Sequence, residues 1–130
     1  PGKVGLRIAF IPDLARKIYA GCDMFLMPSK SEPCGLSQMV ALRYGSIPVV
    51  RETGGLKDSI TDSGDGKGNG FTFQTYDTQD MLNSVHRAIY AYNESKDGWK
   101  VLVERAMACD NSWGRSANDY IRLYKQLINS

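Results

Sequence analysis

The chain has 130 residues, the length of one ordinary domain. Apolar residues make up 42% of it and charged residues 23%, which are the proportions of a globular protein that can bury a sizeable core. Sixteen basic and fourteen acidic side chains leave a net charge of +2. So small a charge, with both signs interspersed, excludes a strongly basic surface of the kind that binds nucleic acid or an anionic membrane.

The cysteine and histidine content argues against a disulfide scaffold and against a zinc site. Cys22, Cys34 and Cys109 cannot all pair, none lies in a C-x-x-C spacing, and His86 is the only histidine. Three cysteines without a pairing pattern fit a reducing cytoplasm. No apolar run approaches the roughly 20 residues that a membrane-spanning helix needs. We therefore expect no metal and no membrane segment in this sequence.

The first elements in chain order are a strand, a helix and a second strand. Residues 6–10 alternate in polarity and predict a strand. Residues 12–20 have apolar side chains at helical spacing, with Pro12 in the first turn, and we expect this helix to stop at Gly21. Residues 23–27 form a nearly continuous apolar run, which is typical of a strand buried on both faces.

The alternation continues after a polar loop at residues 29–34. Residues 35–44 predict a helix closed by Gly45. Residues 47–50 predict another buried strand, and Thr53-Gly54-Gly55 form a turn that leads into a helix at residues 56–60.

The second half is a loop, a short strand and three helices. Residues 62–70 are rich in glycine and aspartate but have neither a dinucleotide fingerprint nor the spacing of a calcium loop, so we interpret them as a plain surface connection. Residues 71–73 predict a strand. Apolar stripes then predict three helices, the first capped near Asp77 or Thr78. The last stripe consists of Trp113, Ala117, Tyr120, Ile121, Tyr124, Leu127 and Ile128.

Strands that alternate with helices predict an α/β fold with a Rossmann-like parallel sheet and flanking helices. In such sheets ligands bind outside the carboxyl ends of the strands. The loops at residues 29–34 and 51–55 follow two of these ends, and they are the places where a ligand site is expected.

The first loop combines a carboxylate with a helix start. Gly35 allows a ligand to approach the backbone closely, and the first amides of the helix, at residues 35–38, suit a phosphate. Because Glu32 would repel that phosphate, it suits a sugar hydroxyl or a developing positive charge. The alternative is that Glu32 is a solvated loop acid, since strand–loop–helix turns are common.

Three further features have two interpretations each. Thr53-Gly54-Gly55 either passes close to a ligand held in the first loop or forms a turn without one. Cys34 is either a reactive thiol at a helix start or a small residue that contributes only its backbone. Phe10 is either a core residue or a platform for a flat ring.

Several ordered motifs resemble the bacterial glycogen synthase and plant starch synthase family. They are Asp23-Met24-Phe25-Leu26-Met27-Pro28-Ser29, Glu32-Pro33-Cys34-Gly35-Leu36, Arg43-Tyr44-Gly45-Ser46-Ile47-Pro48-Val49-Val50-Arg51 and Thr53-Gly54-Gly55-Leu56. The resemblance implies a GT-B glycosyltransferase that transfers glucose from ADP-glucose to the non-reducing end of an α-1,4-glucan with retention. It further implies that residues 1–130 form a single α/β domain portion, the second half of the C-terminal domain of a longer enzyme.

The resemblance also implies roles for individual residues. Glu32 would be catalytic, tuning charge at the anomeric carbon of the donor glucose. Phe10 stands where the family usually has a tyrosine that stacks on adenine, and it would keep the ring face. The remaining donor-binding positions would be Cys34, Gly35, Leu36, Ser37, Thr53, Gly54 and Gly55. Val40 stands where related retaining transferases have a second glutamate, a residue that glycogen synthases also lack.

The same resemblance sets the expected partners. They are ADP-glucose and an α-1,4-glucan that binds mainly to an N-terminal domain absent from this sequence, without a cofactor, a metal, nucleic acid or a membrane. The enzyme would be cytoplasmic in a bacterium or plastidic in a plant, and the chain alone would be inactive. The alternatives are a non-catalytic nucleotide-sugar-binding module or a related transferase with another donor. We also expect part of the last apolar stripe, near Tyr124, Leu127 and Ile128, to remain exposed.

Overall fold

The strand positions of the computed structural model, which describes residues 2–129, agree with most of the sequence pattern. Strands β1 (Met24–Met27), β2 (Ile47–Arg51) and β3 (Phe71–Phe73) form a three-stranded parallel sheet in the order β1-β2-β3. Met24 of β1 pairs with Ile47 of β2, and Val49 of β2 pairs with Phe71 of β3. The parallel α/β fold expected from the alternation is therefore confirmed.

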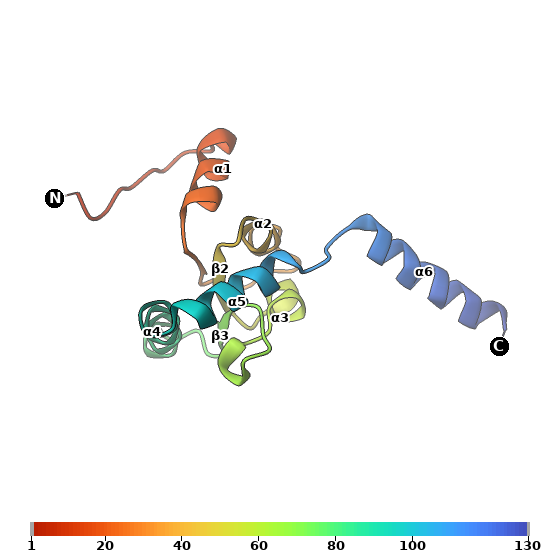
Figure 1. Ribbon diagram of the computed structural model, residues 1–130. Helices are drawn as coiled ribbons and strands as arrows, with labels where there is room; N and C mark the ends of the chain where they lie inside the picture. The colour runs from red at the N-terminus through yellow and green to blue at the C-terminus, as the bar shows by residue number, and fades with distance from the viewer. Residues whose placement is uncertain (1, 130) are drawn as a thin grey trace.

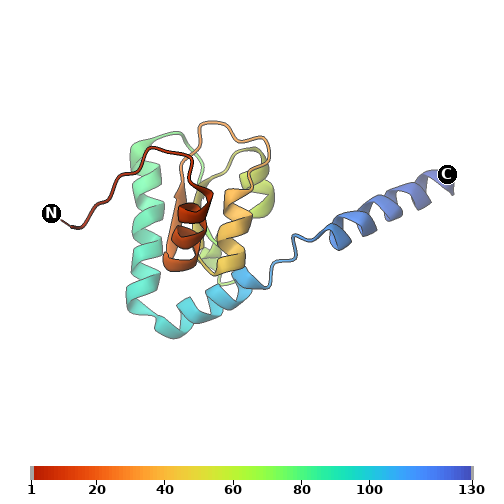
Figure 2. The same cartoon turned by 90° about the horizontal axis from the view of Figure 1, so that it is seen from above.

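The helices surround the central strand (Figures 1 and 2). They are α1 (Pro12–Gly21), α2 (Ser37–Tyr44), α3 (Gly54–Ser59), α4 (Thr78–Glu94), α5 (Lys96–Met107) and α6 (Trp113–Ile128), with a short 3-10 turn η1 (Ser63–Asp65). Helices α2, α3, α4 and α5 contact β2. The spacing predicted that two of these helices start at residues 35 and 56. In the structure α2 begins at Ser37 and α3 begins at Gly54.

The core lies between β2 and the helices that pack on it. Its buried residues are Leu42, Ile47, Val49, Val50, Leu56, Ile60, Phe71, Ala88, Trp99, Leu102 and Ala106. The predicted closure of α2 is confirmed, because Gly45 adopts the left-handed conformation with φ of 77°. A side chain there would also meet Val103 and Met107 of α5, so this glycine allows α2 and α5 to pack closely.

The strand expected at residues 6–10 is wrong. In the described part of the chain this segment has no strand partner, and it runs away from the body of the molecule (Figure 1). Val4, Ile8 and Phe10 are each about nine-tenths exposed. An alternating segment becomes a strand only when a neighbour supplies its ladder of hydrogen bonds, and β1 does not pair with it.

Helix α6 projects from the rest of the molecule as an isolated rod (Figure 2). None of its residues is buried, and Trp113 is 90% exposed. The sequence predicted that only the end near Tyr124 would be exposed, whereas the structure leaves the whole helix exposed. The reason is geometric, because the linker after α5 directs α6 away from the other helices and the sheet (Figure 1).

Candidate functional site

The loop between β1 and α2 lies at the carboxyl edge of the sheet and presents Glu32. Its path is fixed from β2, because Nη1 of Arg51 donates a hydrogen bond of 2.7 Å to the carbonyl oxygen of Lys30. The side chain of Glu32 is half-buried, and its carboxylate has no hydrogen bond within the described residues. The backbone of the loop is thus held in place, and an unpaired carboxylate on it is available to a ligand.

The second predicted loop packs directly on the first. The amide of Gly55 donates to the carbonyl oxygens of Glu32 and Pro33, at 3.2 and 3.1 Å. A Cβ on Gly55 would lie 1.9 Å from the carbonyl oxygen of Cys34, and one on Gly54 would lie 2.1 Å from that of Glu32. The two glycines therefore allow the loops to touch, and their first function is to position the chain around Glu32.

A buried glutamine completes this junction. Gln38 is fully buried at the start of α2, and its Nε2 lies 3.1 Å from the carbonyl oxygens of Cys34 and Gly35 and from Oγ of Ser59. Its Oε1 has no donor among the described residues. Gln38 thus ties the turn before α2 to helix α3, a role that the sequence pattern did not indicate.

The start of α2 is open to an anion. Leu36 occupies the N-cap position without a side-chain hydrogen bond, and Gly35 turns the chain with φ of 70°. The amides that begin the helix therefore have no capping oxygen, and they lie at the positive end of the helix dipole. Leu36 and Cys34 are exposed, and Ser37 is half-buried beside them. These positions surround one turn, as the sequence predicted.

Phe10 lies apart from these loops in the described contacts. Its ring is 95% exposed on the segment before α1. There it lines a hollow of about 180 Å³ together with Arg7 and the first residues of α1. The interpretation of Phe10 as a core residue is therefore wrong. Its exposed ring is compatible with a platform, although the described contacts do not join it to the Glu32 loop.

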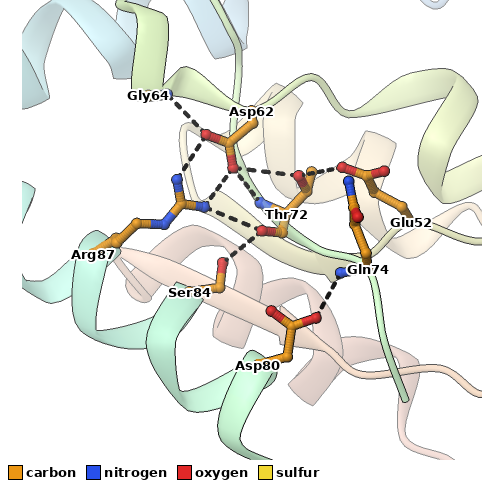
Figure 3. A network of polar contacts seen from close by, with 8 residues as sticks. All are labelled: Glu52, Asp62, Gly64, Thr72, Gln74, Asp80, Ser84 and Arg87. Atoms are coloured by element: carbon orange, nitrogen blue, oxygen red, sulfur yellow. Dashed lines mark hydrogen bonds and ion pairs between the residues drawn. The ribbon is translucent and has the colours of Figure 1, made fainter. Parts of the chain in front are cut away.

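A polar network around Thr72 of β3 was not predicted from the sequence (Figure 3). Nη1 and Nη2 of Arg87 donate to the carboxylate of Asp62 at 2.9 and 2.6 Å. Asp62 also accepts from the amide of Thr72 at 2.8 Å, and the hydroxyl of Thr72 donates to Glu52 at 2.7 Å. The chain of contacts ends at Glu52, the residue before Thr53, so it reaches the second loop.

The electrostatics of this network favour the charged carboxylate. Burial raises the pKa of Asp62, but hydrogen bonds from Arg87, Thr72 and Gly64 outweigh it and lower the pKa to about 2. Asp80, at the start of α4, accepts from the hydroxyl and amide of Thr75, and these bonds lower its pKa. Both acids serve the fold. Among residues 2–129, no group of three or more histidine, cysteine, aspartate or glutamate side chains is placed to hold a metal ion.

The remaining expected features have simple outcomes. His86 is exposed on α4, as predicted. The cap of α4 is Asp77, which accepts from the amides of Gln79 and Asp80. No helix in the described part of the chain is long and apolar enough to cross a membrane.

Comparison with known proteins identifies the class to which this fold and site belong. Residues 8–98 match the protein-family model of glycosyl transferases group 1, and the chain belongs to that family. Within it, the chain is similar to bacterial glycogen synthases. It is 55% identical over 127 residues to that of Clostridium beijerinckii, and 55% identical over 130 residues to that of Geobacillus thermodenitrificans. These matches cover 96% and 98% of this chain, but only 26% and 27% of the relatives.

A solved structure agrees with these relatives. The catalytic domain of starch synthase IV from Arabidopsis thaliana, bound to ADP and acarbose, matches with a TM-score of 0.84 and 44% identity. The match covers 95% of this chain and 26% of that one. The resemblance predicted from the sequence motifs is therefore confirmed, and so is the fold class. The chain spans about a quarter of the length of the relatives it matches.

Proposed function

We propose that residues 1–130 are a donor-binding C-terminal portion of a glycogen synthase. The complete enzyme would transfer glucose from ADP-glucose to the non-reducing end of an α-1,4-glucan, with retention. The observation that carries this proposal is the direct contact of the Gly54–Gly55 backbone with the Glu32–Cys34 loop. That contact holds the backbone of a residue with an unpaired carboxylate, Glu32, in the loop that leads into an uncapped helix start. A nucleotide sugar needs both features, one at its glucose and one at its distal phosphate.

The family resemblance implies the roles of the residues, and their positions support these roles. The amides around Gly35, Leu36 and Ser37 would bind the distal phosphate and the glucose hydroxyls, with a further backbone group from Cys34. Glu32 would stabilise positive charge at the anomeric carbon as the bond to ADP breaks. Such a preorganised group acts most strongly where water is excluded. Thr53, Gly54 and Gly55 would line the donor pocket while they fix the Glu32 loop.

Phe10 would supply the adenine platform, because a phenyl ring keeps the apolar face that a stacked base requires. The starch synthase that matches this fold is described as bound to ADP, which supports a nucleotide ligand for the complete enzyme. Its second ligand, acarbose, supports a glucan acceptor for the complete protein. The similar glycogen synthases are bacterial, which supports the bacterial cytoplasm as its location.

The direct test is a titration of the ¹⁵N-labelled chain with ADP, UDP and ADP-glucose. Because the chain spans only about a quarter of its relatives, we expect ADP to bind no better than about millimolar, near −4 kcal/mol. Amide shifts should appear at residues 35–38 and around Phe10. We also expect no transfer of glucose to glycogen by this chain alone. Shifts confined to residues 62–70 would contradict the proposed donor site.

The role of Glu32 is tested in the complete enzyme. We expect Glu32→Gln to lower kcat by on the order of 100-fold or more, because it removes one preorganised electrostatic group. Thermal stability should stay unchanged, since the carboxylate has no hydrogen bond or ion pair within residues 2–129. Asp58→Asn is the matched control, because Asp58 is exposed on the nearby helix α3 and has no assigned role. Near-normal turnover of Glu32→Gln would leave Glu32 as a solvated loop acid.

A further inference from the structure

A second hollow opens at the carboxyl edge of the sheet, next to Pro28, the first residue of the loop that carries Glu32. Its volume is about 290 Å³, at the lower end of the range of small-molecule sites. Three elements converge on it, namely the residue after β1, the end of β3 and the start of α4. Its lining residues are Pro28, Phe73, Tyr76, Asp77, Thr78 and Met81.

The lining combines apolar surface with polar groups that have spare capacity. Pro28, Phe73 and Met81 form an apolar floor, and Tyr76 is 63% exposed at the rim. Asp77 uses Oδ1 to cap α4, whereas its Oδ2 accepts no hydrogen bond from residues 2–129. The hydroxyl of Thr78 likewise has no hydrogen-bond partner within that range. An apolar ring face with adjacent free acceptors and donors suits a sugar, which has a C–H face and hydroxyls at its edge.

Charge argues against a phosphate in this hollow. Asp77 is among the lining residues, and none of the lining residues in the described chain is a lysine or an arginine. The guanidinium of Arg51, which lies over the Tyr76 ring, already donates to the carbonyl oxygen of Lys30. A neutral ligand with hydroxyl groups therefore fits better than a nucleotide phosphate, which would be repelled by the carboxylate.

Arg51 connects the hollow to the Glu32 loop. Its guanidinium lies over the ring of Tyr76, 5.6 Å from the ring centroid, and the same group donates to the carbonyl oxygen of Lys30. Its Nε is buried and has no acceptor in the described part of the chain. Tyr76 is thus oriented by a side chain that also holds the loop two residues before Glu32, which places the ring beside the donor loops.

We propose that this hollow binds a glucose unit of the α-1,4-glucan, with Tyr76 as the ring platform and Asp77 and Thr78 as partners for its hydroxyls. This inference rests on the proposed function, since it names a second subsite for the substrates of the same enzyme. It assigns a glucan contact to this chain, whereas the family resemblance placed the glucan mainly on an N-terminal domain of the complete enzyme.

The test is a titration of the ¹⁵N-labelled chain with maltoheptaose. The amides of Tyr76, Asp77, Thr78 and Met81 should shift in a saturable way. We expect Tyr76→Ala to raise the Kd by about tenfold, whereas Tyr76→Phe should keep most of the affinity because the ring face remains. Tyr90→Ala is the matched control, because Tyr90 is 70% exposed on α4 and does not line the hollow. It should leave the Kd unchanged.

The outcomes separate this inference from the proposed function. Absence of shifts at residues 76–81, or an equal Kd for the wild-type chain and Tyr76→Ala, would overturn the glucan subsite. A parallel titration with ADP reports on residues 35–38 and tests the donor site independently. In the complete enzyme, Tyr76→Ala should raise the KM for glucan and leave the KM for ADP-glucose unchanged. A rise in the KM for glucan and in the KM for ADP-glucose would show that Tyr76 supports the structure of the loops rather than binding glucan. That result would also overturn the inference.

Discussion

The contact between Gly55 and the Glu32–Cys34 loop can be tested with a single methyl group. In Gly55→Ala the new Cβ would lie 1.9 Å from the carbonyl oxygen of Cys34 and 2.5 Å from its carbonyl carbon. Both atoms belong to the backbone, so no side-chain rotation relieves the overlap. The Glu32 loop and α3 must move apart. The φ of Gly55 is not in the left-handed region, so the substitution tests the close approach alone.

The expected cost follows from three terms. Overpacking of this kind costs about 1–3 kcal/mol. Separation of the loops also weakens the hydrogen bonds from the Gly55 amide to Glu32 and Pro33, which is worth about 1 kcal/mol. Alanine in a helix recovers up to about 1 kcal/mol relative to glycine. The net loss is about 2 kcal/mol, a large part of the roughly 5–15 kcal/mol that stabilises an ordinary domain.

Urea unfolding followed by far-ultraviolet circular dichroism measures this loss. Gly21→Ala is the matched control, because Gly21 ends α1, has an ordinary φ, and no neighbouring atom lies within 4 Å of its added Cβ. Its free energy of unfolding should change by less than about 0.5 kcal/mol. In the complete enzyme, Gly55→Ala should also lower kcat, because Glu32 moves with its loop. Equal stability of the two variants would refute the loop contact on which the proposed site depends.

Two further predictions concern parts of the chain outside this site. The pKa of Asp62 is lowered from 3.8 to about 2 in the fold, so its contribution to stability is present above pH 3.8 and is lost as the pH falls towards 2. The difference in unfolding free energy between the wild-type chain and Asp62→Asn should shrink over that range, and a constant difference would contradict the Arg87–Asp62 pairing. Deletion of residues 112–129 should change the free energy of unfolding by less than about 0.5 kcal/mol, because α6 buries no residue. The same deletion should weaken any self-association seen by sedimentation, because it removes the exposed apolar stripe of α6.

Local patterns predicted the elements that carry their own signals. The apolar runs at residues 23–27 and 47–50 became the adjacent parallel strands β1 and β2. Only β2 is buried, whereas β1 lies at the edge of the sheet with Leu26 44% exposed, so the prediction of a strand buried on both faces is wrong for residues 23–27. Gly45 ends α2 in the left-handed conformation that glycine adopts without strain. These features depend on residues a few positions apart, which a single sequence displays directly.

Features that need a distant partner were harder to predict. The alternation at residues 6–10 is a genuine strand pattern, but in the described part of the chain no strand pairs with it. Similarly, the stripe of α6 shows which face is apolar without showing what covers it. The glycines at positions 54 and 55 were identified as a place of close approach. Their partner, the backbone of the first loop, became visible only in three dimensions.

The polar network around Asp62 links residues 62–70, a segment without a recognisable motif, to the candidate site. Residues 62–70 appeared to be a plain connection, yet Asp62 pairs with Arg87, 25 residues further along the chain, and with the amide of Thr72. No local motif signals such a pairing, because each partner is an ordinary polar residue in its own segment. Through Thr72 the network holds Glu52, the residue that precedes Thr53, Gly54 and Gly55. Those glycines in turn fix the backbone at Glu32. The position of the proposed catalytic carboxylate therefore depends on contacts that begin on α4, far from the donor loops in sequence.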